Sequence, residues 1–241
     1  MKAVILVAGI AKRLLPYTKD IPKCLIQLDD RTIMDYQLSA LDQVGVRDIV
    51  MVVGYRRDQI MEAARQRFPQ MNYAFITNHR YEETNTAYSL WLAAEHFLDQ
   101  DFVYLNGDVL FPPELLRRLI ESRLPNALAV EVKACGEEEV KVLTNGAGRI
   151  VDIGKELDQA EAIGEFIGVA RFSAAYSRPF YQALNDTVDA GMDMAYFEYA
   201  LQETAARHEL QLVDVSDMPC IEIDYPEDLF QAREKIKQMK L

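Results

Sequence analysis

The chain has 241 residues, half of them hydrophobic, and it carries a net charge of −12. This hydrophobic content is enough for a sizeable core, and no apolar run reaches the roughly 18 residues that cross a membrane. The acidic balance argues against general nucleic-acid binding, because no long basic stripe is present. An anionic substrate would therefore need local cations or a metal ion.

The beginning of the chain and its cysteines lead us to expect a cytoplasmic protein. Residues 1–9, MKAVILVAG, form a short apolar run that leads into a glycine turn, unlike a secretory signal peptide. The three cysteines have no paired spacing, which is typical of reduced thiols. We expect them to be small core or loop residues: Cys24, Cys135 and Cys220.

Strand and helix patterns alternate through the first half of the chain. Four apolar runs predict strands, at 2–8, 48–54, 72–78 and 102–108. Helical spacing, capping residues and helix-ending glycine or proline predict helices at 32–45, 57–68, 85–98 and 112–122. This alternation predicts an α/β fold with a mostly parallel sheet, helices on both faces and right-handed crossovers.

The pattern changes after about residue 122. Strands are expected next, at 127–134, at 140–156 with a hairpin turn at 144–149, and at 164–173. Helices at about 174–190 and 194–206, short strands at 211–215 and 219–223, and a last helix at 226–239 complete the chain. No flexible linker interrupts it, so we expect one domain over residues 1–241.

Residues 6–25, LVAGIAKRLLPYTKDIPKCL, gather cations on an irregular loop after the first strand. In parallel α/β sheets, ligands bind beyond the carboxyl ends of the strands. Ala8 and Gly9 are small enough for the backbone to approach a ligand, and N–H groups there can hold phosphate. Arg13 offers a fork for phosphate oxygens and Lys23 a point charge. The alternative is a solvated surface loop, the more common explanation for a lysine taken alone.

This segment resembles the signature of the sugar-phosphate and phosphocholine nucleotidylyltransferases. Their pattern is an apolar strand, then L-A-A-G-x-G-x-R-L-x-P-x-T, then P-K. Val7 stands at the first alanine and Ala11 at the second glycine, where alanine is tolerable if its φ angle is negative. The matching residues are Gly9, Arg13, Pro16, Thr18, Pro22 and Lys23.

The resemblance implies a Rossmann-like nucleotidyltransferase fold of the GT-A type and transfer of a nucleotidyl group. A phosphate oxygen of the acceptor would attack the α-phosphorus of a nucleoside triphosphate, and pyrophosphate would leave. Arg13 would hold the pyrophosphate, and Lys23 would bridge the α-phosphate and the acceptor phosphate. Residues of about 1–122 would bind the nucleotide and residues of about 123–241 the acceptor. Further expected nucleotide contacts are Val7, Ala8, Gly9, Gly107 and Asp108.

Two aspartates follow predicted strands, Asp108 in YLNGDVLF and Asp224 in PCIEIDYPEDL. If Pro226 takes the first helical position, Tyr225 is the helix cap and Asp224 is free for another task. For Asp108 alone, an Asx-turn explains the sequence equally well. Two carboxylates beside a phosphate loop suit Mg²⁺, and in the resembled family the matching aspartates bind the catalytic metal.

Residues 77–93, TNHRYEETNTAYSLWLA, lack the P-x-G-L-A run of the sugar nucleotidylyltransferases. Their NTAYSL run resembles the N-x-x-Y-S-L of phosphocholine cytidylyltransferases, which implies CTP. Candidate base or ribose contacts are Asn78, Thr84, Asn85 and Ser89, and helix capping is the alternative for Asn85.

The runs IGKE at 153–156 and GEFIGVARFS at 164–173 resemble the same branch. An aromatic ring with carboxylates is what a cationic head group needs. A solvated strand end is the alternative for Lys155, and core packing is the alternative for Tyr196. The expected acceptor contacts are Lys155, Glu165, Gly168, Tyr196, Glu198 and Glu222.

The sequence therefore predicts Mg²⁺-dependent cytidylyl transfer from CTP to a phosphorylated amino alcohol such as phosphocholine, or to a relative such as phosphoethanolamine or aminoethylphosphonate. A sugar-1-phosphate uridylyl- or thymidylyltransferase is an alternative, but it should carry the missing base-reading run. A non-catalytic nucleotide-binding regulatory module should have lost Lys23 or an aspartate. A GT-A glycosyltransferase would carry Asp-x-Asp, whereas this strand ends in NGDV.

Overall fold

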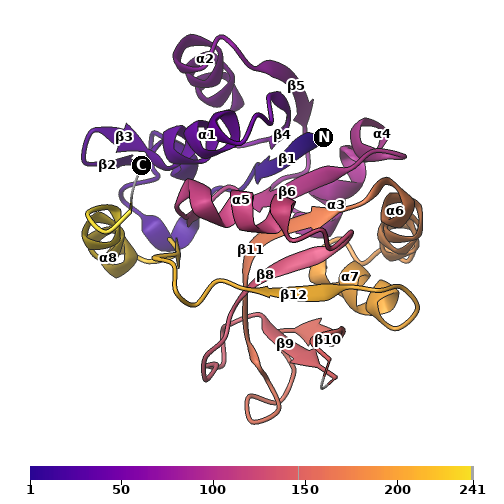
Figure 1. The fold of residues 1–241 in the computed structure, drawn as a ribbon. Helices are drawn as coiled ribbons and strands as arrows, with labels where there is room; N and C mark the ends of the chain where they lie inside the picture. Colours follow the sequence, from indigo (N-terminus) through magenta and orange to yellow (C-terminus); the bar gives the residue numbers. More distant parts are fainter. Residues whose placement is uncertain (146, 240–241) are drawn as a thin grey trace.

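The computed structural model describes residues 1–145 and 147–239. Its centre is a nine-stranded sheet that contains strands from both halves of the chain (Figure 1). Seven strands follow one another in the order β10 (Ile150–Gly154), β9 (Lys141–Thr144), β11 (Gly164–Phe172), β6 (Phe102–Asn106), β1 (Lys2–Val7), β4 (Asp48–Val53) and β5 (Asn72–Thr77). The remaining two are β8 (Ala127–Glu131), beside β11, and β12 (Gln211–Asp214), beside β8.

The two halves of the sheet differ in strand direction. In the first half, β1 runs parallel to β4 and β6, and β5 runs parallel to β4. In the second half, β11 runs antiparallel to β6, β8 and β9. The predicted α/β architecture with a mixed, mostly parallel sheet and flanking helices is confirmed, and β11 joins its two parts.

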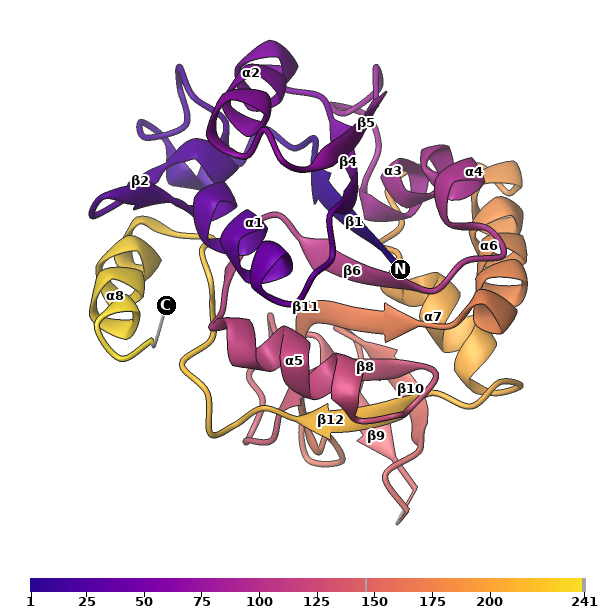
Figure 2. The same ribbon diagram turned by 45° about the horizontal axis from the view of Figure 1, so that its top comes forward.

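Helices cover both faces of the sheet (Figure 2). One face carries α1 (Ile33–Gln43), α2 (Arg57–Arg67) and α5 (Pro113–Glu121), and the other carries α3 (Thr86–Leu92), α4 (Ala94–Phe97), α6 (Ala174–Asp189) and α7 (Glu198–Ala205). Alternation along β1 explains the two layers, because successive side chains of a strand point to opposite faces. Ala3 and Ile5 pack in the first layer, whereas Val4 and Leu6 pack in the second.

A third, smaller core packs the segment that follows β1 against the C-terminal part of the chain. Leu14 of the short helix η1 (Lys12–Leu14) packs with Leu28 of β2 (Gln27–Leu28) and Leu229 of α8 (Pro226–Ile236). β2 pairs with β3 (Arg31–Thr32), and β13 (Ile221–Glu222) pairs with β7 (Val109–Leu110). The second pairing sets Glu222 opposite Val109, so it draws the segment around Asp224 toward Asp108.

Several sequence predictions need correction or completion. The single helix expected at 85–98 is wrong, because Ala93 separates α3 from α4. The Ala93 N–H bonds to Leu90 in a tighter turn, and Ala93 and Phe97 are fully buried, so packing overrides the continuous helical pattern. The hairpin between β9 and β10 forms as expected, although Gly146 of its turn lies outside the described residues.

The three cysteines are free thiols buried within the fold, as the sequence predicts. Among the described residues, no helix has the length and the apolar character that a bilayer crossing requires.

Candidate active site

A cavity of about 930 Å³ opens beyond the carboxyl ends of β1 and β6. Residues of both halves of the chain line it, and their individual roles remain predictions. The lining includes every residue for which the sequence predicts a catalytic, nucleotide, metal or acceptor role, apart from the additional glycine Gly168: Val7, Ala8, Gly9, Arg13, Lys23, Asn78, Thr84, Asn85, Ser89, Gly107, Asp108, Lys155, Glu165, Tyr196, Glu198, Glu222 and Asp224.

The loop after β1 departs from expectation at Ala11. Its φ of 54° and ψ of 56° are left-handed, so the negative φ on which its tolerance depended is wrong. Two hydrogen bonds hold this turn, because the Ala11 carbonyl accepts from the Thr18 hydroxyl at 3.0 Å and from the Leu14 N–H at 3.1 Å. The left-handed region costs an alanine about 1–2 kcal/mol, so the loop keeps the glycine-like backbone without the glycine.

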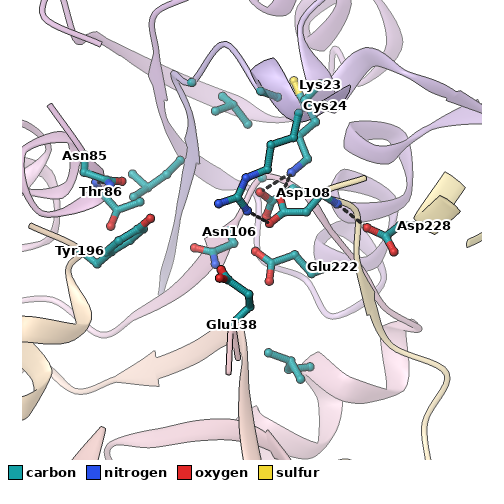
Figure 3. Close-up of a pocket in the computed structure, with 18 of the residues that line it drawn as sticks. Lys23, Cys24, Asn85, Thr86, Asn106, Asp108, Glu138, Tyr196, Glu222 and Asp228 are labelled. Carbon is teal, nitrogen blue, oxygen red and sulfur yellow. Dashed lines mark hydrogen bonds and ion pairs between the residues drawn. The ribbon is translucent and has the colours of Figure 1, made fainter. Parts of the chain in front are cut away.

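Lys23 lies at the start of the short helix η2 (Lys23–Leu25) and reaches both aspartates. Its Nζ donates to Asp108 Oδ2 at 2.9 Å and to Asp224 Oδ1 at 2.6 Å (Figure 3). The Arg13 guanidinium lies 3.4 Å from Asp224 Oδ2. Burial alone would lower the pKa of Lys23, but the two carboxylates raise it well above its usual value. Burial likewise opposes ionisation of Asp224, yet Lys23 and Arg13 lower its pKa overall.

The donor set around Asp108 fits a hard divalent cation. Asp108, Glu222 and Asp224 each offer one carboxylate oxygen, and these three oxygens lie within 4.8 Å of one another. Asp108 Oδ1 is buried and has no hydrogen-bond partner among the described residues. An Asx-turn does not explain this aspartate, since its other oxygen bonds to Lys23. Sequence reasoning placed Glu222 only with the acceptor, whereas the structure also places it in this acidic cluster.

Glu222 connects the acidic cluster to the acceptor side of the cavity. Enclosure within the cavity and the nearby carboxylates of Asp108 and Asp224 raise its pKa to about 8, even though solvent still reaches the side chain. A cation that binds beside these three residues would relieve the repulsion between them.

The polar residues expected to read the base form a hydrogen-bonded cluster of their own. The Asn78 amide donates to the hydroxyls of Thr84 and Ser89, at 3.0 Å each, and all three side chains are buried. The Asn85 side chain accepts from the Thr86 N–H and caps α3, as the alternative explanation stated. These four residues shape the wall of the cavity, and their buried hydrogen bonds occupy much of their own polar capacity.

The acceptor side holds an ion-pair cluster that sequence reasoning missed. Glu131 and Glu165 stand directly opposite each other on β8 and β11, an arrangement that repels unless a cation intervenes. The Lys133 ammonium supplies this cation, at 3.0 Å from Glu131, 3.1 Å from Glu139 and 2.7 Å from Glu165. Despite burial, these glutamates raise the pKa of Lys133. Glu165 lines the cavity as expected, but one of its oxygens is already paired.

Tyr196 and Lys155, both expected to contact the acceptor, interact with each other. Tyr196 is 46% exposed, so core packing does not explain it. The Lys155 ammonium lies 5.4 Å from the centre of the Tyr196 ring and therefore covers one aromatic face. Figure 3 shows Tyr196 beside Asn85 and Thr86, across the cavity from Lys23 and Asp108. One face of Tyr196 is therefore already occupied by a cation of the chain itself.

Glu198, the first residue of α7, is a carboxyl of this side that makes no ion pair among the described residues. Its side chain lines the cavity, the residue is only 7% exposed, and its Oε2 has no hydrogen-bond partner among the described residues. Burial raises its pKa to about 7, an effect that its own backbone N–H and the more distant Lys155 only partly oppose. Unlike Glu165, this carboxyl is free to meet a cationic group in the cavity.

Two further residues shape the site without having been predicted. Asn106 lines the cavity, and its Oδ1 accepts from the Tyr104 hydroxyl at 2.5 Å. Gly168 has a φ of 75°, and a Cβ there would meet the Asn106 amide nitrogen at 2.5 Å, so this glycine leaves room for Asn106 instead of lining the cavity. Buried Lys141 donates to the carbonyls of Glu137 and Lys155 and anchors the acceptor-side loops. In the sequence, the NGD run at the end of the strand predicted at 102–108 could have pointed to Asn106.

Comparison with known proteins assigns a family to this arrangement. The nucleotidyl transferase family profile matches residues 2–139, more than half of the chain. A CTP:phosphoglutamine cytidylyltransferase of Campylobacter jejuni is 26% identical over 98% of this chain and 100% of its own length. A CMP-5'-(3-aminopropyl)phosphonate synthase of Streptomyces rubellomurinus is 30% identical over 96% of this chain but only 38% of its own length.

Solved structures agree with this assignment. The CTP:phosphocholine cytidylyltransferase of Streptococcus pneumoniae has a TM-score of 0.80 and 20% identity, with 98% of each chain covered, and it shows the shared fold. The inositol-1-phosphate CTP transferase of T. maritima has a TM-score of 0.81 and 26% identity, and covers 98% of this chain and 96% of its own. The resemblance stated from the sequence is confirmed: the chain belongs to the nucleotidyl transferase family and is a nucleotidyltransferase enzyme.

Proposed function

We propose that the protein transfers a cytidylyl group from CTP to a small phosphorylated acceptor that carries a primary ammonium group, and releases pyrophosphate. The observation that carries this proposal is the buried, unpaired carboxyl of Glu198 in the same cavity as the cationic loop and the acidic cluster. A carboxyl in this position selects for a cationic head group, because burial without a partner is unfavourable.

The reaction needs no protein nucleophile. The second pKa of a phosphate monoester is near roughly 6, so the acceptor phosphate is ionised at neutral pH and can attack the α-phosphorus directly. Catalysis then consists of positioning and charge stabilisation. Lys23 would hold the α-phosphate beside the acceptor phosphate, and Arg13 would hold the departing pyrophosphate. Asp108 and Asp224, with Glu222 beside them, would bind Mg²⁺, which supplies Lewis-acid and template chemistry.

Two observations support CTP as the nucleotide. The NTAYSL run resembles the cytidylyltransferase branch, and residues 77–93 lack the base-reading run of the sugar enzymes. The relatives in Campylobacter jejuni and Streptomyces rubellomurinus are named for CTP or for a CMP product. The Asn78 cluster would then support the wall against which the base lies.

The cavity favours a primary ammonium over the quaternary ammonium of phosphocholine. Lys133 already pairs with Glu165, and Lys155 already covers Tyr196. Glu198 and Glu222 are left without an ion pair among the described residues. A primary ammonium donates three N–H bonds to such oxygens, whereas a trimethylammonium donates none. The cavity therefore fits the phosphoethanolamine and aminoalkylphosphonate class better than phosphocholine.

A competition assay tests this proposal. Pyrophosphate release would be measured with each of the four nucleoside triphosphates, and then with CTP and equal concentrations of phosphoethanolamine, phosphocholine, glucose-1-phosphate and inositol-1-phosphate. We expect CTP and phosphoethanolamine to be preferred. Preference for a polyol or sugar phosphate would overturn the acceptor assignment and leave nucleotidyl transfer intact.

The variant Glu198→Gln connects the preference to one carboxyl. It should lower kcat/KM for phosphoethanolamine by at least about tenfold, the scale of one lost charged hydrogen bond, and should change kcat/KM for glucose-1-phosphate much less. Glu203→Gln is the matched control, because Glu203 is an exposed residue on the same helix. An equal loss for both acceptors in Glu198→Gln would remove Glu198 from ammonium recognition.

A further inference from the structure

Lys23 occupies the carboxylates to which the proposed function assigns a metal ion. Its ammonium lies 2.9 Å from Asp108 Oδ2 and 2.6 Å from Asp224 Oδ1, and its side chain is only 12% exposed. Arg13 adds a second positive charge 3.4 Å from Asp224. Of the three carboxylates in the acidic cluster, two are therefore already neutralised by cations of the chain itself.

An ammonium group and a divalent cation compete for this position. Mg²⁺ and Mn²⁺ prefer oxygen ligands such as carboxylates, and one oxygen of Asp108 and one of Asp224 accept hydrogen bonds from Lys23. Two like charges held a few ångströms apart in a partly buried site also repel strongly. A metal ion that binds the Lys23-bound oxygens of both aspartates must therefore displace the ammonium from at least one of them.

The released ammonium needs a new partner, because a charged group that loses its partner in a buried site is costly. The cavity beside Lys23 is bordered by Ala8 and Gly9. A Cβ at Gly9 would meet no described atom within 4 Å, so this border is open. A triphosphate lying there would offer oxygens to the flexible Lys23 side chain.

We propose that Lys23 is an internal stand-in for the metal: it holds Asp108 and Asp224 together in the nucleotide-free protein and moves to the triphosphate only when metal and nucleotide bind together. This inference rests on the metal assignment in the proposed function. It makes metal and nucleotide binding strongly cooperative. The metal ion neutralises the aspartates that Lys23 leaves, and the triphosphate provides a new partner for the Lys23 ammonium. It also gives a catalytic lysine a role before any chemistry occurs.

Binding of Mn²⁺ to the full chain, followed by electron paramagnetic resonance of the free ion, tests the inference without turnover. In the absence of nucleotide, Lys23→Met should bind Mn²⁺ at least about tenfold more tightly than the unaltered protein, because the competing charge is gone. Lys23→Arg keeps the competing charge and should stay weak. Lys12→Met removes the same charge from an exposed residue of the same loop and should change the affinity by less than about threefold.

A non-hydrolysable CTP analogue supplies the second half of the test. It should tighten Mn²⁺ binding to the unaltered protein by a larger factor than to Lys23→Met, because only the former must move its lysine. Unchanged or weaker nucleotide-free binding in Lys23→Met would overturn the inference.

Asp108→Asn, made in both the unaltered and the Lys23→Met backgrounds, separates the inference from the proposed function. It should weaken Mn²⁺ binding in both. If it does not, the ion binds elsewhere, and the metal assignment is overturned together with the inference. If binding depends on Asp108 but ignores Lys23→Met, only the inference is overturned.

Discussion

Two lysines occupy opposite sides of one cavity, and both are held by carboxylates. Lys133 meets three glutamates at 2.7–3.1 Å, one for each N–H of its ammonium. Lys23 meets only two aspartates, and beside them Asp108 Oδ1 is buried without a partner among the described residues. The Lys133 cluster is fully satisfied and serves the structure, whereas the Lys23 cluster has an unsatisfied oxygen that can bind another cation.

The same comparison explains which carboxyls are available to a substrate. Glu165 is held by Lys133, so it contributes to the wall of the cavity. Glu198 lies deeper, has no ion pair among the described residues, and keeps a pKa of about 7 because it is buried. Unpaired carboxyls are costly for the folded state, and a cationic group of a ligand would offset that cost.

The largest effect that this comparison predicts is on turnover at the Lys23 side. Asp108→Ala and Asp224→Ala should each lower kcat by at least about two orders of magnitude, the scale seen when charge stabilisation is removed. Glu131→Gln, which removes one partner of Lys133, should lower kcat by less than about tenfold. Steady-state kinetics with Mg²⁺ would measure both. Circular dichroism should show that the aspartate variants fold, since both residues lie beyond strand ends. Near-normal activity in either aspartate variant would contradict the metal assignment.

The sequence allows the Lys23 side to be predicted far better than the Lys133 side. Arg13 and Lys23 lie within one loop, and Asp108 and Asp224 each follow a strand, so local patterns place them at one edge of the sheet. Lys133, by contrast, meets glutamates whose proximity depends on the pairing of β8 with β11, a register with an irregularity between Phe166 and Ala170. Long-range strand register of this kind leaves no local signal in the chain.

Tertiary contacts also decide the surroundings of residues that the sequence did single out. Glu222 was expected only among the acceptor contacts, yet its oxygen lies within 4.8 Å of those of Asp108 and Asp224. Whether that residue belongs to the metal or to the acceptor depends on the β7–β13 pairing, which brings Asp108 beside it. Tyr196 was expected to offer a free aromatic face, and only the three-dimensional structure shows Lys155 over it.

A smaller effect is predicted for stability at the acceptor side. The folded protein keeps a proton on Glu198 up to pH about 7, whereas the unfolded chain releases it near pH 4.5. Stability is therefore lost as the pH rises through this interval. Glu198→Gln should remove that loss, so the free energy of unfolding at pH about 8 should rise by up to about 3 kcal/mol, with little change near pH 5.

Urea unfolding at several pH values would measure the Glu198 effect. Glu203→Gln, on the exposed face of the same helix, should leave the pH dependence unchanged. A pH-independent difference between Glu198→Gln and the unaltered protein would show that Glu198 is not a buried, unpaired carboxyl in solution. If the predictions for both acceptor preference and stability hold, the residue that recognises the ammonium is also one that weakens the fold.

The smallest predicted effect is a change in stability at Ala11, in the loop that carries Lys23. Ala11 has a left-handed backbone that its family pattern assigns to glycine. Ala11→Gly removes about 1–2 kcal/mol of steric cost from the folded state. The greater freedom of glycine in the unfolded chain destabilises the folded state by about 0.5–1 kcal/mol. The expected result is a net gain of about 0.5–1 kcal/mol in the free energy of unfolding, measured by urea denaturation. Ala206→Gly is the matched control, because Ala206 is exposed and has a right-handed φ of −62°, so the same change there should lose stability. A loss at both positions would mean that Ala11 does not adopt the left-handed turn in solution.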